Sequence, residues 1–267
     1  FFMQSDLFMN RALEISVGSL SPTINWRTLA AQEFPLPPPD EQRRLVEVLE
    51  TFEKAINSYR SLEARATQLR KAIQENWLLD PESDGTSGTR IDEFVMVNPR
   101  DPALPSDAPF VPMEAVQEWN RQIERFEIKG SRGGVRARAG DILLARITPC
   151  LENGKTAQVP DSVERCGGST EFIVLRAKPG ISPDFIYWMA TAPRVRKSAI
   201  GLMHGSTGRQ RLAAPDFARL NVAVASQEKV NQAVESLNQI EKVYWDLLQR
   251  INEIKSFKKS FLALVLN

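Results

Sequence analysis

The sequence predicts an α+β protein that combines a mixed α/β domain with two long antiparallel helices of a coiled coil. Three observations predict this class. Heptad-spaced apolar residues occupy residues 40–79 and 227–266, short runs rich in β-branched residues lie between these segments, and an internal repeat relates the two. The 267 residues, with 42% hydrophobic and 25% charged side chains, suffice for one large or two modest globular domains.

Residues 1–39 have the character of the tail of a larger domain. A short helix is expected from Asp6 to Val17, where Gly18 ends it. The run Phe34-Pro-Leu-Pro-Pro-Pro-Asp40 excludes a helix before Asp40, because proline lacks an amide donor and restricts the residue that precedes it. The first residues do not read like a natural start, so we expect further residues upstream.

A long helix is expected from Asp40 to Leu79. Asp40 provides an N-cap, and Glu41 places a negative charge in the first turn, where the helix dipole favours it. Apolar residues then recur at steps of four and three, at Leu45, Leu49, Phe52, Ile56, Tyr59, Leu62, Ala66, Leu69 and Ile73. At about 1.5 Å per residue this helix is roughly 60 Å long, so it needs a helical partner.

The partner lies in the same chain, from Gln227 to Leu266, and neither helix contains an internal proline or glycine. The apolar seam of this second helix comprises Val230, Ala233, Leu237, Ile240, Tyr244, Leu247, Ile251, Ile254, Phe257 and Phe261. Because the domain between the helices leaves enough chain for a return, the two seams are expected to pair antiparallel.

The two helices also belong to copies of one unit, because matching residues lie 188 positions apart. The matched pairs are Leu49 with Leu237, Phe52 with Ile240, Leu69 with Phe257, Ile73 with Phe261, Ile24 with Leu212, Leu29 with Phe217, Phe34 with Val222 and Leu36 with Val224. Such a period is typical of duplicated domains. We therefore divide the chain into a domain tail (1–39), a first long helix (40–80), a whole domain (81–225) and a second long helix (226–267).

The whole domain begins with a polar linker at residues 81–88. Runs of aliphatic and β-branched residues predict strands at Asp141–Ile147, Ala157–Val159 and Glu171–Ala177. A helix is expected at Pro183–Leu202, with a break at Pro193. The domain is therefore expected to be a mixed α/β domain of low regularity.

No catalytic, metal or cofactor site is predicted. His204 is the only histidine, and Cys150 and Cys166 are too few for a four-ligand zinc site, so we expect two reduced thiols in a cytoplasmic protein. The run Asn153-Gly-Lys-Thr is no phosphate loop, because Pro149 stands where that motif needs glycine. The sequence contains no run of 18 apolar residues, so no membrane partner is expected.

Positive charge concentrates within the whole domain. Between Arg121 and Arg211 there are sixteen Lys and Arg but eight Asp and Glu, an excess of eight in a chain whose net charge is +1. Basic residues beside glycines follow a phosphate backbone and reach guanine edges, so we expect DNA contacts. The candidates are Lys129, Arg132, Arg136, Arg138, Arg146, Lys155, Arg209 and Arg211.

Each candidate group has a simpler alternative. The residues at 129–138 are equally explained by a solvated basic loop, and those at 209 and 211 by a domain-closing turn. Arg146 follows an apolar strand, so the alternative to a DNA contact there is a buried structural role. The aromatic residues Trp119, Tyr187 and Trp188 are assigned to the core rather than to base stacking.

Several segments in a fixed order resemble the specificity subunits of type I restriction-modification systems. Phe34-Pro-Leu-Pro-Pro-Pro-Asp-Glu-Gln-Arg-Arg-Leu45 is similar to that family's lead-in to a long helix. The Gly18-Ser19 and Gly205-Ser206-Thr207 turns are similar to its domain-closing turns, and Gly140-Asp-Ile-Leu-Leu-Ala-Arg-Ile-Thr-Pro-Cys150 to a segment of its target-recognition domains.

The resemblance implies a non-catalytic subunit that reads one half of a split double-stranded DNA site with each target-recognition domain. It also implies helices that set the spacing and dock methyltransferase (M) subunits, with restriction (R) subunits joining them. This chain contains one whole recognition domain and the tail of another, so a truncated product, a fragment and a half subunit that forms a homodimer all remain open. One rival class is a coiled-coil adaptor that does not bind DNA. A weaker rival is a nuclease or methyltransferase, against which the missing catalytic motifs argue.

Overall fold

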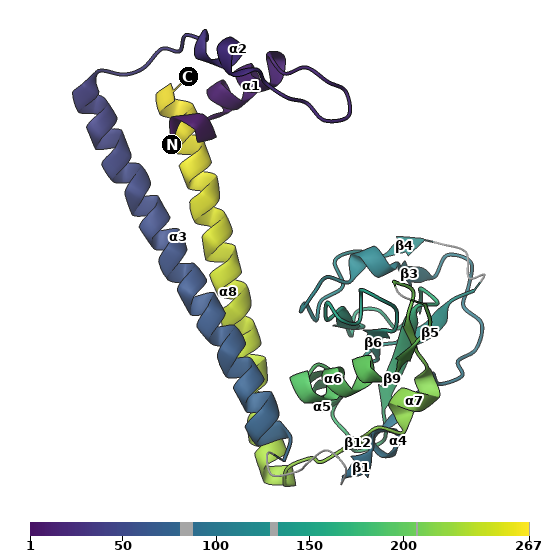
Figure 1. Cartoon of the computed structure of the whole chain (residues 1–267). Coiled ribbons are helices and arrows are strands. Elements are labelled where there is room, and N and C mark those ends of the chain that lie inside the picture. The colour runs from purple at the N-terminus through teal and green to yellow at the C-terminus, as the bar shows by residue number, and fades with distance from the viewer. Residues whose placement is uncertain (81–87, 129–132, 207, 267) are drawn as a thin grey trace. The chain divides into compact units, whose positions relative to one another are not determined.

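The computed structural model describes residues 1–80, 88–128, 133–206 and 208–266 (Figure 1). The chain divides into two compact units, one of residues 69–239 and one of residues 1–68 with 240–267. No helix within the described ranges combines the length and apolarity that crossing a membrane requires. The predicted boundaries at residues 39, 80 and 225 stay predictions, and the linker at 81–87 falls outside the described residues.

The unit of residues 69–239 is built on two four-stranded sheets (Figure 1). The first is antiparallel and has the order β2 (Val95–Val97), β9 (Phe172–Ala177), β6 (Ile142–Ala145), β7 (Thr156–Gln158). The second has the order β4 (Glu127–Ile128), β3 (Pro109–Val111), β8 (Arg165–Gly168), β5 (Val135–Arg138), with β3 and β8 parallel. The three predicted strands are confirmed as β6, β7 and β9, each within two residues of the predicted ends.

Two short strand pairs and several short helices complete this unit. The pairs are β1 (Thr89–Arg90) with β12 (Asn221–Val222) and β10 (Met203–His204) with β11 (Arg211–Leu212). The helices are α4 (Ile91–Phe94), η3 (Met113–Ala115), α5 (Pro183–Ala190), α6 (Pro193–Gly201) and α7 (Ala214–Ala218). The helix predicted at residues 183–202 is therefore confirmed as two helices, with the second beginning at Pro193.

Strand β6 is central because it is buried on both faces. Ile142 and Leu144 pack in one apolar cluster with α5, α6 and the start of α8, whereas Leu143 and Ala145 pack in another cluster with the second sheet. Alternate side chains of a strand point to opposite faces, so one strand joins the two layers. A strand buried on both sides reads as a continuous apolar run, which is why its sequence was recognisable.

Both long helices span nearly the expected ranges, although the last turn of the first is not α-helical. Helix α3 spans Pro39–Ile73 and continues as a π-helical turn, η2 (Gln74–Leu78), and α8 spans Gln227–Leu266. Within unit 69–239 their ends are anchored by polar bonds. The Gln74 Nε2 donates to the Trp188 carbonyl at 2.9 Å, and the Trp188 Nε1 donates to the Asn238 side chain at 2.9 Å.

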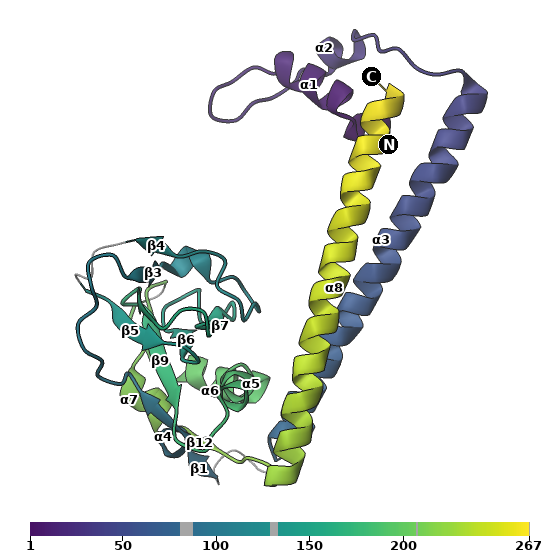
Figure 2. The same ribbon diagram turned by 180° about the vertical axis from the view of Figure 1, so that it is seen from behind.

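In the other unit, α3 and α8 run side by side and antiparallel (Figures 1 and 2). The Phe52 ring lies 6.0 Å from the Phe261 ring, and further toward the C-terminus of α3 the Tyr244 hydroxyl donates to Glu63 at 3.4 Å. Leu49 and Leu247 are each buried, at 3% and 9% exposure. The predicted antiparallel pairing is therefore confirmed.

The predicted seam is wrong at three positions. Leu62, Leu69 and Phe257 are 47%, 53% and 68% exposed, respectively. A straight α-helix has 3.6 residues per turn and drifts by about 20° per heptad, so residues spaced by 3.5 rotate off the contact line. Leu69 and Phe257 are equivalent residues of the two copies, and each is followed by a basic residue that is less exposed. Arg70 is half-buried, and Lys258 is 9% exposed.

The duplication is also visible as repeated elements. Helix α2 (Trp26–Ala30) and α7 begin and end 188 positions apart, as do the first residues of α3 and α8. Ahead of α2, helix α1 (Asp6–Glu14) and a bridge between Val17 and Thr23 repeat α6 and the β10–β11 pair. Helix α1 ends three residues before the predicted Val17, because Val17 pairs with Thr23 instead of extending the helix.

Candidate nucleic-acid interface

The described candidate basic residues lie in two groups, at opposite ends of strands β6 and β9. Ile142 pairs with Leu175 at one end of these antiparallel strands, and Ala145 pairs with Phe172 at the other. We call the first the Arg176 end, because Arg176 follows Leu175, and the second the Glu171 end, because Glu171 precedes Phe172. The register of the sheets therefore separates residues that are close in sequence.

Arg136 and Arg138 belong to the Arg176 end. Both side chains are exposed on strand β5, and the Arg136 Nη1 donates to the Asp101 carbonyl at 2.6 Å. The backbone amide of Arg138 donates to the Asp141 carboxylate at 2.9 Å. Since Arg138 forms no ion pair with any described residue, its charge faces solvent and is available to an anion.

Arg176 counted toward the positive excess, but the fold neutralises it. It is 6% exposed, and its guanidinium donates to Asp141 at 2.8 and 2.7 Å and to Asp101 at 3.0 Å. The hydrogen bond from Arg176 holds the pKa of Asp101 below its usual value. Two carboxylates thus surround one guanidinium, and this group is a structural ion network rather than a DNA contact.

Arg146, Arg209 and Arg211 gather at the Glu171 end. The strand pairing of Ile147 with Arg211 and the bond from the Thr148 amide to the Gln210 carbonyl, 3.0 Å long, bring residues 146–148 beside 210–212. Arg209 is exposed, and Arg211 forms a two-pronged ion pair with Glu171 at 2.8–3.0 Å. The same hydrogen bond lowers the pKa of Glu171.

Arg146 is half-buried, and its Nε is fully buried without a hydrogen-bond partner. Its position supports the alternative drawn from the sequence, that this arginine is a structural residue under the surface. Lys155 is also half-buried, and its Nζ lies 3.4 Å from the Met113 carbonyl. These two residues therefore present less of their charge to solvent than Arg209 does.

Lys129 and Arg132 lie outside the described residues, as does Thr207 of the Gly205-Ser206-Thr207 turn. The glycines after Arg132 have a clear role in the backbone. Gly134 has a φ of +97°, and a Cβ there would lie 2.1 Å from the Gly168 carbonyl oxygen, so only glycine allows β5 to begin beside β8.

Trp119 and its neighbours form a group that the sequence did not predict. Tyr187 and Trp188 are buried in the core as expected, but Trp119 is half-buried and belongs to neither apolar cluster. The Arg196 guanidinium lies 3.7 Å from the Trp119 ring centroid, that of Arg70 lies 5.7 Å away, and the Lys71 Nζ lies 5.8 Å away. We call these four residues the Trp119 cluster. The one signal in the sequence was the basic pair at 70–71.

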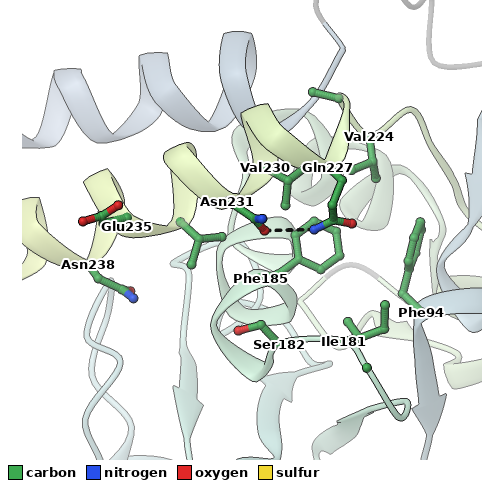
Figure 3. Close-up of a pocket in the computed structure, with 13 residues that line it drawn as sticks. Phe94, Ile181, Ser182, Phe185, Val224, Gln227, Val230, Asn231, Glu235 and Asn238 are labelled. Atoms are coloured by element: carbon green, nitrogen blue, oxygen red, sulfur yellow. Dashed lines mark hydrogen bonds between the residues drawn. The ribbon is translucent and has the colours of Figure 1, made fainter.

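A pocket of about 420 Å³ lies between the first turns of α8 and the turn before α5 (Figure 3). Phe94, Phe185 and Val230 line it, and Gln227 donates to Asn231 at 2.9 Å on its rim. Glu235 also lines the pocket, whereas no described lysine or arginine does. A site with this charge does not suit a phosphate, so the pocket is not part of the candidate interface.

The described residues contain no group of three or more His, Cys, Asp or Glu side chains placed to hold a metal ion. Cys166 is fully buried, and burial raises its thiol pKa to about 12. His204 is exposed, with its Nε2 3.9 Å from the Asp216 carboxylate.

Comparison with known proteins points in one direction. No protein-family model matches the chain. The chain is 29% identical over 137 residues to the type I restriction enzyme EcoAI specificity subunit of Escherichia coli, a match that spans 48% of this chain and 23% of that one. The aligned part therefore covers less than a quarter of the relative.

Solved structures share the fold over nearly the whole chain. A chain of the type I R-M system, from a study of its complex assembly and conformational transition, has a TM-score of 0.60 at 18% identity, covering 98% of this chain and 68% of that one. The S subunit from M. genitalium gives 0.53 at 13% identity, with 97% and 69% covered. The HsdS subunit from Thermoanaerobacter tengcongensis gives 0.50 at 17% identity, with 98% and 67% covered.

These neighbours have the combination of sheet domain and long helices that the sequence predicted, so the fold class is confirmed. The chain has the fold of type I specificity subunits and is similar in sequence to one of them, and the family resemblance drawn from its motifs is confirmed.

Proposed function

We propose that this chain is a DNA-recognition subunit of a type I restriction-modification system, and that the domain at residues 81–225 reads duplex DNA. The observation that carries the proposal is the exposure of Arg209 and Arg211 at the Glu171 end, on a fold shared with specificity subunits. Arginines at a surface turn fit both the phosphate backbone and guanine edges. The target sequence then depends on the geometry of these side chains.

The two ends of the β6–β9 pair have separate roles in this proposal. Arg209, Arg211 and Lys155 contact the DNA phosphate backbone at the Glu171 end. On binding, Arg211 either exchanges its Glu171 partner for a phosphate or stays paired with Glu171. Arg136 and Arg138 contact DNA at the other end, together with Lys129 and Arg132. Arg132 and Arg136 are the proposed readers of base edges, because they flank the glycine pair, and Arg146 supports the turn from beneath.

The proposed partners are duplex DNA, methyltransferase subunits and restriction subunits, and the proposed setting is the cytoplasm. The paired helices α3 and α8 carry the exposed apolar side chains Leu62, Leu69 and Phe257, which a docked subunit would cover. Methyltransferase subunits are the proposed occupants of these helices. A homodimer is proposed for the case in which the chain works as a half subunit.

The chain itself is proposed to be non-catalytic, with neither nucleotide, metal nor methyl donor bound. The purified chain is expected neither to cut duplex DNA nor to transfer methyl groups. The test incubates a highly purified sample with supercoiled DNA, Mg²⁺ and a labelled methyl donor. Cleavage that disappears when the chain's carboxylates are mutated would contradict this part of the proposal.

DNA binding is tested by fluorescence anisotropy on randomised duplexes, with and without the methyltransferase subunit, over a range of salt concentrations. Replacing Arg209 and Arg211 by Gln is expected to weaken binding to every duplex and to lower the log–log salt slope by about one unit per lost phosphate contact. A base-reading arginine, tested as Arg136→Gln, is instead expected to cost about 1–3 kcal/mol on the cognate site and to relax preference at one position.

A matched control is Arg43→Gln, which removes an exposed arginine from the first turns of α3. It is expected to leave affinity and slope unchanged. If the wild-type chain with its partner binds no duplex, or if the changes at residues 136, 209 and 211 leave both quantities unchanged, the chain does not recognise DNA as proposed. The coiled-coil adaptor function then takes its place, and the exposed apolar side chains on α3 and α8 are the observation that favours it.

A further inference from the structure

The Trp119 cluster brings three cationic side chains to one indole ring. Arg70 and Lys71 come from the last turns of α3, Arg196 comes from α6, and Trp119 lies in the loop before β4, all within the unit of residues 69–239. The cationic groups lie 3.7 to 5.8 Å from the ring centroid. The Trp119 ring thus contacts cationic side chains from the end of the long helix and from α6.

No carboxylate compensates these charges within the described chain. Arg70, Lys71 and Arg196 form no ion pair with a described residue, and the Arg196 Nη1 is fully buried with no hydrogen-bond partner. Burial and the nearby charge of Arg70 lower the pKa of Arg196, in that order of importance. By contrast, Arg211 of the same unit is paired with Glu171. The cluster therefore holds unneutralised positive charge, which an anion would stabilise.

The backbone at this place is strained. Trp119 has a φ of +60°, a region that costs a non-glycine residue roughly 1–2 kcal/mol. The ring lies against Gly154, where a Cβ would come within 2.9 Å of both the Trp119 ring and the Arg196 Nη1. Strained residues held by their surroundings concentrate at binding sites. The turn at residues 149–155 is thus shaped to admit the stacked tryptophan and guanidinium.

The internal repeat provides a comparison within the same chain. Lys258 and Lys259 lie 188 positions after Arg70 and Lys71, in the equivalent turns of α8. Lys258 is paired with Glu53 and bonded to Gln4, and Lys259 lies 3.5 Å from Asp6. One copy of the basic pair is therefore neutralised by the chain and the other is not, so the positive charge at 70–71 is not a requirement of helix packing.

We propose that Arg70, Lys71 and Arg196 bind one backbone phosphate of duplex DNA. This inference rests on the proposed function and adds a site outside the candidates that the sequence provided. Guanidinium groups present paired N–H donors that match phosphate oxygens, and stacking on Trp119 fixes the orientation of one of them. Lys71 is exposed and adds a mobile charge at the rim. The phosphate would bridge the last turns of α3, at Arg70 and Lys71, and helix α6 of the same unit.

The test compares two variants with a matched control in the full chain assembled with its methyltransferase partner. Arg70→Gln with Lys71→Gln removes the helix charges, and Arg196→Gln removes the stacked guanidinium. The control Arg60→Gln with Arg65→Gln removes two exposed arginines from earlier turns of α3, in the other compact unit. Anisotropy on a randomised duplex measures affinity against salt, and ethylation interference on the cognate duplex maps the phosphates that matter.

Each of the two variants is expected to weaken binding roughly tenfold on cognate and random duplexes alike, and to lower the salt slope by about one unit. Ethylation of one phosphate should impair wild-type binding but no longer impair binding by the variants. Arg196→Lys keeps the charge and is expected to keep the slope, which a purely structural role of the stacked guanidinium would not predict. The control pair should change neither quantity.

The outcomes separate this inference from the proposed function. If the wild-type complex binds DNA and the changes at residues 209 and 211 lower the slope, but those at 70, 71 and 196 do not, this site is overturned and DNA recognition stands. If no duplex is bound by the wild-type complex, both fail. If circular dichroism shows that the double variant has lost its fold, the single change Lys71→Gln at an exposed position is used instead. A smaller drop in the salt slope then supports the site, and an unchanged salt slope refutes it.

Discussion

Two leucines that the sequence assigns to the seam of α3 should respond differently to truncation. Leu49 is 3% exposed, whereas Leu62, 13 residues further along, is 47% exposed. Sequence spacing alone assigns both to the seam. We expect Leu49→Ala to destabilise the helix pair strongly and Leu62→Ala to have little effect, because only Leu49 loses packed contacts with α8.

The magnitudes follow from burial. Truncating a buried leucine to alanine costs about 2–5 kcal/mol, and a two-helix seam that relaxes around the cavity favours the lower half of that range. At Leu62 about half of the transfer free energy is already absent in the folded state, and alanine has the better helix propensity, so the net cost should stay below about 1 kcal/mol. The expected difference is about 2 kcal/mol.

Urea unfolding followed by far-UV circular dichroism measures this difference, because α3 and α8 dominate the helical signal. A loss of about 2 kcal/mol corresponds to a melting shift of roughly 4–8 °C for a chain of this size, which heating would also resolve. The more disruptive changes Leu49→Asp and Leu247→Asp should abolish the pairing, since each buries a carboxylate without a partner. Equal losses for Leu49→Ala and Leu62→Ala would refute the placement of the seam.

Three further predictions concern the sheet domain. Arg176→Met should cost about 3–5 kcal/mol in unfolding free energy, because it leaves the buried Asp141 and the half-buried Asp101 without their guanidinium partner, and a loss below about 1 kcal/mol would contradict the network. Asp101 has a lowered pKa, so its contribution to stability is present above the unfolded pKa and is lost as pH falls through the folded value. The difference in unfolding free energy between wild type and Asp101→Asn should therefore close below about pH 4 in acid titrations. With a pKa raised to about 12, Cys166 should resist thiol reagents at neutral pH in the native state and react at once in denaturant, as labelling and mass spectrometry would show.

The positions of the elements were largely determined by local sequence. Asp40 and the prolines before it predicted the start of α3 within one residue, and Pro193 predicted the break between α5 and α6. Strand β6 was recognisable because it is buried on both faces. Short strands such as β3, β5 and β8 were missed, because three or four residues carry no periodicity and are held by pairing with distant segments.

The distribution of functional charge was decided by the tertiary structure. The sequence showed an excess of positive charge in one domain, but Arg176 was counted with Arg138 although the carboxylates of Asp101 and Asp141 neutralise it. Arg136 and Arg211 were both candidates for DNA contact, yet the register of the sheets places them at opposite ends of strands β6 and β9.

The internal repeat shows the same division between sequence and tertiary structure. From the sequence alone, the basic pairs at 70–71 and 258–259 are equivalent residues of two copies. Only folding brings Glu53 and Asp6 to one pair and Trp119 and Arg196 to the other. Local sequence determines where a helix begins and which face is apolar, because these depend on neighbours along the chain. Whether a charge is compensated depends on groups that are distant in the sequence, and therefore on the packing of the whole unit.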